Sequence, residues 1–460
     1  MAGVAMNAPV LDASDIQGLL RTGYGTLPHA RFTVYSITTA AGGRQFLAWL
    51  ADRTTPASAR KAATATQVAL TLDGMRALAV PEAVLSDFSL EFTTGMSAVS
   101  RSRFLGDIGD QDPSTWRWGG PAQPAAHLLV MAYGVDPATL NTLCSQIDQV
   151  ATANAVDVAT RLDTATLSDH EPFGFRDGIS QPNVTGLSPS ATPAGTPLTT
   201  GEFVLGYPNA YGKLAPRPIL SAELDPGHIL PLDAQGSGGA DLGLNGSYLV
   251  LRTLRQDVDG FWAYVKSIAP DREIDFAARL VGRWPSGAPL VLTPDLDQGQ
   301  LGTSNDFGYH DLDPAGLRCP IGAHIRRANP RDSLDPNPGS SESVATTNRH
   351  RLLRRGRKYG ADAASSERGL HFVALNADLS RQFEFVQHSW LNSPKFDGLY
   401  DEGDPIAGAH AADCANFTAQ DTPIRSRYHD LPSFVSVRGG AYFFLPGLRA
   451  IRYLAADKNP

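Results

Sequence analysis

Four segments of the chain repeat one pattern of apolar and polar positions. Their first residues are Arg31, His127, Ser247 and His371. Each segment opens with a run of β-branched and aromatic residues of strand length, crosses a short turn and continues with helical spacing. In the second, for example, Leu140, Cys144 and Ile147 fall three or four positions apart, on one face of a helix. The pattern predicts four strand-then-helix units.

Additional strand-like runs between these units indicate the fold class. "ATQVALTLD" (65–73) follows the first unit, and "AVDVATRLD" (155–163) follows the second. Two strand–helix–strand units in each half are typical of a ferredoxin-like sandwich, with helices on an antiparallel sheet. We therefore predict an α+β protein with a duplicated ferredoxin-like fold, in which helices pack on two four-stranded antiparallel sheets. Near the end, Gly439-Gly440 separates two strand-like runs and predicts a hairpin.

A turn-rich stretch, "ELDPGHILPLDAQGSGGADLGLNGS", marks the expected boundary between the halves. We place the two domains at residues 1–230 and 231–460. Two long irregular regions, 169–246 and 293–366, remain, and long loops in a compact protein are usually functional or disordered. The polar segment around 336–347 belongs to the second region, and the sequence leaves its order open.

Composition narrows the class of protein. The 460 residues are 42% hydrophobic and 19% charged, as in a soluble globular protein, and no apolar run is long enough to span a membrane. The formal charge of −8 argues against a nucleic-acid partner. The first residues lack the pattern of a secretory signal, which predicts a cytoplasmic location. Three scattered cysteines, Cys144, Cys319 and Cys414, are expected to be reduced thiols.

Candidate chemistry lies in the irregular regions. His324 stands in "CPIGAHIRRANPRD", and a lone histidine in such a segment is more often structural than a ligand. The chain has no H-E-x-x-H or C-x-x-C motif, which argues against zinc, whereas one histidine is enough to hold a haem. In "RHRLLRRGRKYG", the leucines before Arg354 and Arg355 indicate that one arginine points inward, where it needs an anion. Asp177, in "EPFGFRDGISQP", is a candidate partner, although it could merely organise a glycine-rich turn.

These segments resemble those of the dye-decolorising peroxidases. "GFRDG" fits the family's G-x-x-D-G signature, "AHIRRANPR" resembles the segment with the proximal haem histidine, "LLRRG" that with the distal arginine, and "RGLHFVAL" the strand that follows. The four pieces occur in the family's order and cover most of the chain from residue 30 onward. The resemblance implies a haem-b peroxidase that reduces hydrogen peroxide through a ferryl intermediate and oxidises dyes, phenols or other one-electron donors.

The resemblance also implies roles for individual residues. His324 would be the axial ligand of haem iron, Asp177 the distal acid–base residue and Arg354, rather than Arg355, the distal arginine. Asp404, in "EGDPIAG", would bond the proximal histidine, with Asp397 as the alternative. The other residues expected around the haem are Leu370, Phe372, Gly174, Gly178, His170 and either Arg326 or Arg331. The first domain would then carry the distal loop, and the second would carry the haem ligand and the distal arginine.

Other readings remain open at this point. The chain could be a haem-handling, deferrochelatase-like protein with little peroxidase turnover, although storage alone has no need of an acid–base pair. It could also be a ferredoxin-like interaction module without haem. Trp390, Tyr359 and Tyr400 are candidates for relaying electrons to surface donors, although aromatic residues are more often simply packed in a core. Duplicated ferredoxin-like domains often self-associate, so a homo-oligomer is a further expectation.

Overall fold

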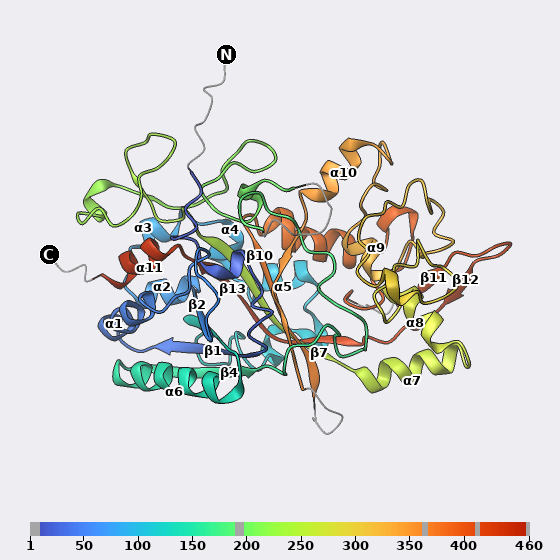
Figure 1. The fold of residues 1–460 in the computed structure, drawn as a ribbon, viewed down its shortest axis with the longest axis horizontal. Coiled ribbons are helices and arrows are strands. Elements are labelled where there is room, and N and C mark those ends of the chain that lie inside the picture. The colour runs from blue at the N-terminus through green and yellow to red at the C-terminus, as the bar shows by residue number, and fades with distance from the viewer. Residues whose placement is uncertain (1–9, 189–196, 361–366, 410–414, 457–460) are drawn as a thin grey trace, which may run out of the picture.

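The computed structural model describes residues 10–188, 197–360, 367–409 and 415–456 (Figure 1). Within these residues, nine strands form one antiparallel sheet in the order β4-β1-β3-β2-β13-β7-β10-β8, with β9 also paired to β10. The strands of this sheet are β1 (His29–Ile37), β2 (Thr64–Leu70), β3 (Leu128–Gly134), β4 (Val156–Asp163), β7 (Ser247–Gln256), β8 (Leu353–Arg354), β9 (Arg357–Tyr359), β10 (Arg368–Asn376) and β13 (Val435–Leu445).

The sheet consists of two units with the same topology. In the first, α1 (Ala40–Ala51) connects β1 to β2, and α6 (Pro137–Ala153) connects β3 to β4. In the second, α7 (Val258–Ile268) follows β7, and two π-helical turns, η7 (Ser380–Glu384) and η8 (Val386–Leu391), follow β10. The strand orders β4-β1-β3-β2 and β13-β7-β10-β8 correspond strand for strand. The predicted duplicated ferredoxin-like α+β fold is therefore confirmed.

The two expected sheets are not separate. Strand β13 of the second unit pairs with β2 of the first, where Phe444 lies opposite Leu70, so the halves share one sheet. The expected hairpin at Gly439-Gly440 was also wrong, because β13 continues through both glycines beside β7, with a shift of register between Val437 and Gly439. A side chain at Gly439 would collide with the indole of Trp118, which explains a glycine inside a strand. The domain boundary near residue 230 stays a prediction.

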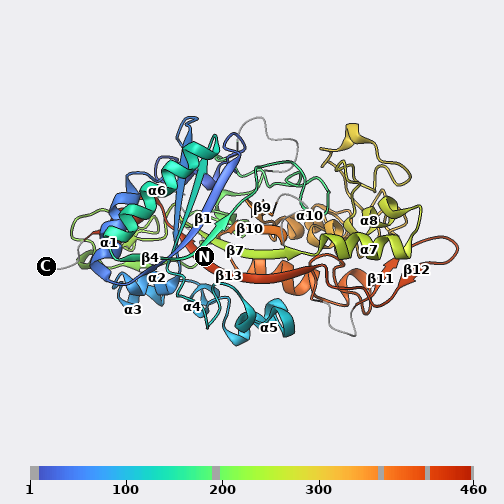
Figure 2. The same cartoon turned by 90° about the horizontal axis from the view of Figure 1, so that it is seen from below.

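The two faces of the sheet are covered differently. Along β3, Leu128 and Val130 join the core under the helices, whereas Leu129 and Met131 join a second core that is closed by loops. This follows from the alternation of side chains along a strand. Figure 2 shows α1 and α6 over the N-terminal strands and α7 and α8 at the opposite end of the molecule. The last helix of the fold, α11 (Leu448–Ala455), packs beside α1 (Figure 1).

The remaining elements are short. They are α2 (Leu72–Ala77), α3 (Glu82–Leu85), α4 (Leu90–Thr94), α5 (Val99–Leu105), α8 (Glu273–Val281), α9 (His324–Ala328), α10 (Ser341–Asn348), and the strands β5 (Ile219–Leu220), β6 (Ala240–Asp241), β11 (Phe417–Ala419) and β12 (Ser426–Tyr428). Helix α10 lies in the polar stretch whose order the sequence left open. No helix in the described residues is long and apolar enough to cross a membrane. Cys144 and Cys319 are buried free thiols, and Cys414 lies outside the described residues.

Candidate active site

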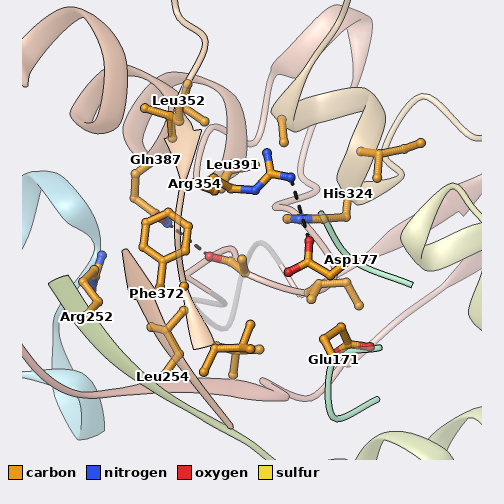
Figure 3. A pocket seen from close by; sticks show the side chains of 18 of the residues that line it. Glu171, Asp177, Arg252, Leu254, His324, Leu352, Arg354, Phe372, Gln387 and Leu391 are labelled. Carbon is orange, nitrogen blue, oxygen red and sulfur yellow. Dashed lines mark hydrogen bonds and ion pairs between the residues drawn. The ribbon is translucent and has the colours of Figure 1, made fainter. Parts of the chain in front are cut away.

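A cavity of about 340 Å³ lies against the helix-covered face of the sheet in the second unit (Figure 3). Because side chains alternate along a strand, every second residue of β10 faces the cavity. Leu370 and Phe372 line it, whereas His371 between them is buried on the opposite face and stacks on Tyr359. On β7, Leu254 lies opposite Leu370 and continues the apolar wall. The volume and apolar lining are those of a site for a small molecule or cofactor.

The loop that carries Asp177 is fixed by a half-buried glutamate. The carboxylate of Glu171 accepts hydrogen bonds from the backbone N–H groups of Phe173 (2.9 Å) and Phe175 (2.8 Å) and from Gln256 on β7 (2.7 Å). Both phenylalanines are buried in a core cluster of the second unit. The pKa of Glu171 is raised by burial, although these hydrogen bonds oppose the rise. The "EPFGFRDG" stretch is thus a rigid loop that points Asp177 into the cavity (Figure 3).

Two glycines permit the shape of this loop. Gly174 and Gly178 adopt φ angles of +98° and +79°, the left-handed region that side chains disfavour. A Cβ atom at either position would meet no atom within 4 Å. The glycines are therefore required by backbone conformation and not by a lack of room. Gly178 lines the cavity beside Asp177, and its N–H donates a 2.6 Å hydrogen bond to the Asp177 carboxylate.

Arg354 and Asp177 meet across the cavity. The Nη2 atom of Arg354 lies 3.8 Å from Oδ1 of Asp177, and the Asp177 side chain remains 55% exposed toward the open space. Arg354 lies opposite Ala374 on β10, and its backbone N–H donates to the side chain of Gln181. Arg355 points to the other face of the sheet and donates to the Leu19 carbonyl. Strand alternation therefore places Arg354, and not Arg355, in the cavity.

His324 also lines the cavity and is held by a buried carboxylate. Its Nδ1 atom lies 3.0 Å from Oδ2 and 3.1 Å from Oδ1 of Asp404, whose side chain is fully buried. Oδ1 of Asp404 also accepts from the N–H groups of Ile406 and Ala407. The bond to Nδ1 leaves Nε2 of His324 for another ligand. Asp397, the alternative, lies on the turn Phe396–Gly398 with a φ of +46°.

Charge and burial compete at this pair. Burial alone would lower the pKa of His324, but attraction and hydrogen bonding from Asp404 raise it above its ordinary value. Burial alone would raise the pKa of Asp404, but His324, and then Arg327 and the Ala407 N–H, lower it below its usual range. The pair therefore favours an ionised Asp404 and a hydrogen on Nδ1 of His324.

Several cations gather at the cavity. Burial, together with the neighbouring charges of Arg331 and Arg354, lowers the pKa of Arg351 to about 9. Arg283 shows the same effect, with a pKa of about 10 from burial and from Arg331. All four arginines line the cavity. Such a cluster favours binding of an anion, which would restore these pKa values.

Three of the residues expected around the haem do not line the cavity: Gly174, His170 and Arg326. Arg326 is buried, but its guanidinium donates to Asp313 and to the Cys319 carbonyl (3.0 Å) and is absent from the cavity lining. His170 is exposed, 2.8 Å from Asp169, and also does not line the cavity. The side chains of His170 and Arg326 turn toward other partners, although their neighbours Glu171 and Ile325 line the cavity.

The three aromatic candidates for electron relay occupy different environments. Trp390 is buried, with its ring at 5.1 Å from that of His350, which lines the cavity. The Tyr359 hydroxyl donates to Glu367, and Tyr400 is 76% exposed. Of the three candidates, only Trp390 contacts the ring of a residue that lines the cavity.

Comparison with known proteins decides the family. No family model matches the chain. A "Multifunctional dye peroxidase DyP2" from an Amycolatopsis species is 30% identical over 75% of this chain and 74% of its own length. A "Dye-decolorizing peroxidase" from Exidia glandulosa is 29% identical over 96% of this chain and 86% of its own length. The chain belongs to the dye-decolorising peroxidase family. It is therefore a peroxidase, an oxidoreductase, as the sequence predicted.

The fold of this dye-decolorising peroxidase agrees with that membership. The crystal structure of a fungal DyP-type peroxidase from Auricularia auricula-judae superposes with a TM-score of 0.79 and 26% identity, over 98% of this chain and all of the other.

Sequence reasoning missed two residues that shape the site. Glu171 was part of the quoted loop but was given no role, although a carboxylate just before two aromatics and a glycine is a candidate for capping backbone N–H groups. Arg351 lay within the basic run, and its Nη2 donates to the Ser180 carbonyl (3.1 Å) beyond the Asp177 loop. The leucines after Arg351 are the signal that could have shown it to be partly enclosed.

Proposed function

We propose that this dye-decolorising peroxidase binds haem b, reduces hydrogen peroxide and oxidises dyes, phenols or other one-electron donors. One observation carries the proposal: the Asp177–Arg354 pair faces the same cavity as His324, which is backed by Asp404. A carboxylate beside a fixed guanidinium suits proton transfer to and from peroxide, and a carboxylate-bonded histidine suits iron. The two halves of a peroxidase site are thus brought together from segments far apart in the sequence.

The residues present fit a haem. Nε2 of His324 is the nitrogen left for the iron, since Nδ1 is bonded to Asp404. Leu254, Leu370 and Phe372 offer an apolar wall to a porphyrin face. The cation cluster at Arg351, with its depressed pKa, suits the porphyrin carboxylates. When bound, haem supplies the iron at which peroxide is reduced and the oxidising power that is passed to the donor.

The chain's own residues then have separate tasks. Asp177 accepts the proton from the near oxygen of hydrogen peroxide and returns it to the far oxygen, which leaves as water. The guanidinium of Arg354 stabilises the negative charge that develops on the departing oxygen. Asp404 keeps the Nδ1 proton of His324 in a hydrogen bond, which orients the ring and makes it a stronger donor to the iron.

A spectroscopic titration tests the proposal. The ultraviolet–visible spectrum of haem-reconstituted protein is recorded before and after one equivalent of hydrogen peroxide, for wild type, His324→Ala and Asp177→Ala. We expect a Soret band that shifts with peroxide in wild type, weakens in His324→Ala, and persists but shifts slowly in Asp177→Ala. No band in wild type after haem supply would overturn the proposal.

The alternative is a haem-handling protein with little turnover. It predicts a Soret band that peroxide leaves unmoved or simply bleaches, so the same titration separates the two functions. The cytoplasmic location and the self-association expected from the sequence stay predictions.

A further inference from the structure

Two adjacent buried arginines on α9 have contrasting partners. Arg326 and Arg327 are 1% and 0% exposed, and neither reaches solvent. Arg326 turns toward the segment 313–319, where it donates to the carbonyls of Asp313 and Cys319 and to the Asp313 carboxylate. Arg327 turns the other way, toward the end of the π-helical turn η8 and the segment that carries Asp404. Burying a cation is costly, so each arginine must have a reason to be there.

The guanidinium of Arg327 binds four backbone carbonyls. Nε donates to Trp390 (2.8 Å), Nη1 donates to Glu402 (3.0 Å), and Nη2 donates to Leu391 (3.3 Å) and Ser393 (2.5 Å). The guanidinium group also lies over the Phe396 ring, with its Cζ atom 4.9 Å from the ring centroid. A planar guanidinium spreads five N–H donors over three nitrogens, whereas the ammonium of lysine has three N–H donors on one nitrogen and cannot reach four separated acceptors.

Two of these carbonyls connect Arg327 to Asp404, the partner of His324. The Leu391 carbonyl accepts from the backbone N–H of Asp404 (2.7 Å) as well as from Arg327. The Glu402 carbonyl, two residues before Asp404, is the other link. Arg327 therefore holds the backbone on both sides of Asp404: the Glu402 carbonyl before it in sequence and the Leu391 carbonyl to which its N–H donates. These contacts place the Asp404 carboxylate 3.0 Å from Nδ1 of His324. Arg327 and His324 are also three residues apart on the same helix, so the contacts form a closed loop.

We propose that Arg327 is the positioning residue of the proximal pair, holding Asp404 against His324 and thereby setting the donor strength of the histidine toward the cofactor. Attraction between Arg327 and Asp404 supports this. Burial lowers the pKa of Arg327, but Asp404 opposes that change, and Arg327 in turn lowers the pKa of Asp404, so each favours the charged form of the other. Residues that orient a ligand's hydrogen-bond partner affect a metal site although they never touch the metal. The inference rests on the proposed haem function.

The adjacent arginine provides a matched control. Arg327→Lys keeps the positive charge but cannot reach four carbonyls, and Arg326→Lys makes the same change at an equally buried site without contact to Asp404. We expect both variants to lose thermal stability. Only Arg327→Lys should shift the haem reduction potential to more positive values, since a weaker bond to Nδ1 makes His324 a poorer donor. Peroxide reactivity should fall roughly 10- to 100-fold with it. Equal potentials in wild type and both variants would overturn the inference.

A second variant and a second readout guard against misfolding and against failure of the haem proposal. Phe396→Leu removes only the ring beneath the guanidinium, and we expect a smaller shift of the same sign. In protein without haem, the NMR resonance of the His324 Nδ1 proton reports the bond to Asp404 directly. It should move upfield in Arg327→Lys and Phe396→Leu but not in Arg326→Lys. A wild type that takes up no haem would refute the proposed function alone, whereas an unmoved Nδ1 resonance would refute the role of Arg327.

Discussion

Asp177 and Arg354 come from opposite halves of the chain, yet Nη2 of Arg354 lies 3.8 Å from Oδ1 of Asp177. A loop locked by Glu171 supplies the carboxylate, and the strand β8 supplies the guanidinium. The gap between them is wider than a direct hydrogen bond, so both groups keep donors and acceptors for a small molecule. Tertiary packing alone therefore brings these two side chains together.

Substitution of each of the two neighbouring arginines in "LLRRG" is expected to have a different effect, one on catalysis and the other on stability. In Arg354→Lys we expect the rate of reaction with hydrogen peroxide to fall roughly 100-fold, because the charge-stabilising fork is lost. In Arg355→Lys we expect that rate to be nearly unchanged, with a loss of about 1–2 kcal/mol in the free energy of unfolding, since bonds to the Leu19 and Leu20 carbonyls are removed. Stopped-flow kinetics and chemical denaturation measure the two effects. If Arg355→Lys reacted slowly with hydrogen peroxide and Arg354→Lys reacted at the wild-type rate, the roles of the two arginines would be reversed.

Asp404 and Asp397 make a similar pair on the proximal side. Asp404→Asn removes the negative charge from the bond to Nδ1 of His324, and we expect roughly a 10- to 100-fold loss of haem affinity or activity. Asp397→Asn should leave the haem spectrum and affinity as in wild type. Haem titration followed at the Soret band provides the comparison, and the prediction fails if the two variants behave alike.

The backbone at Gly178 can be tested by two substitutions that differ in their tolerance of positive φ. Gly178→Ala should cost about 1–2 kcal/mol or displace Asp177, because its φ of +79° is strained for alanine although space is available. Gly178→Asn should cost less, since asparagine tolerates the left-handed region better. Thermal unfolding and the rate with peroxide report the difference. A larger effect of Gly178→Asn than of Gly178→Ala would mean that bulk, and not conformation, matters here.

His371 predicts a pH dependence of stability. Burial lowers its pKa to about 4, although a contact with the Asp163 carbonyl opposes the shift. The unfolded chain binds a proton near pH 6.5, whereas the folded chain binds it only near pH 4, so stability falls as the pH drops through this window. The loss reaches about 3 kcal/mol. In His371→Gln, urea denaturation between pH 7 and 4 should show a correspondingly flatter profile. An unchanged slope would mean that other groups dominate.

Much of the fold could be predicted because it is written in local periodicity. The apolar runs that begin near Arg31 and His127 became β1 and β3, and the helical spacing after each became α1 and α6. The continuity of β13 could not be predicted, because Gly439 looks like a turn until Trp118, remote in sequence, occupies the space of its side chain. The joining of the two sheets through Leu70 and Phe444 is also invisible locally.

The site was partly readable for the same reason. His324 and Asp177 stand in distinctive segments, and the structure brings both to one cavity. The direction of a long side chain is harder to predict, as Arg326 shows: nothing in "HIRRA" distinguishes it from Arg327, and only the surrounding carbonyls decide which way each turns. Packing partners that are remote in sequence set these orientations.

The place of α11 has a consequence for biosynthesis. This helix packs its Ile451 and Leu454 into the core that α1 forms with Phe46 and Leu50, so the first unit is completed by a segment that is translated after all the strands of the second unit. Until that segment leaves the ribosome, the nascent first half exposes an apolar surface that its own residues cannot cover. Completion of the first unit therefore waits until the second unit has been translated, and a chaperone would be expected to shield the first half until then.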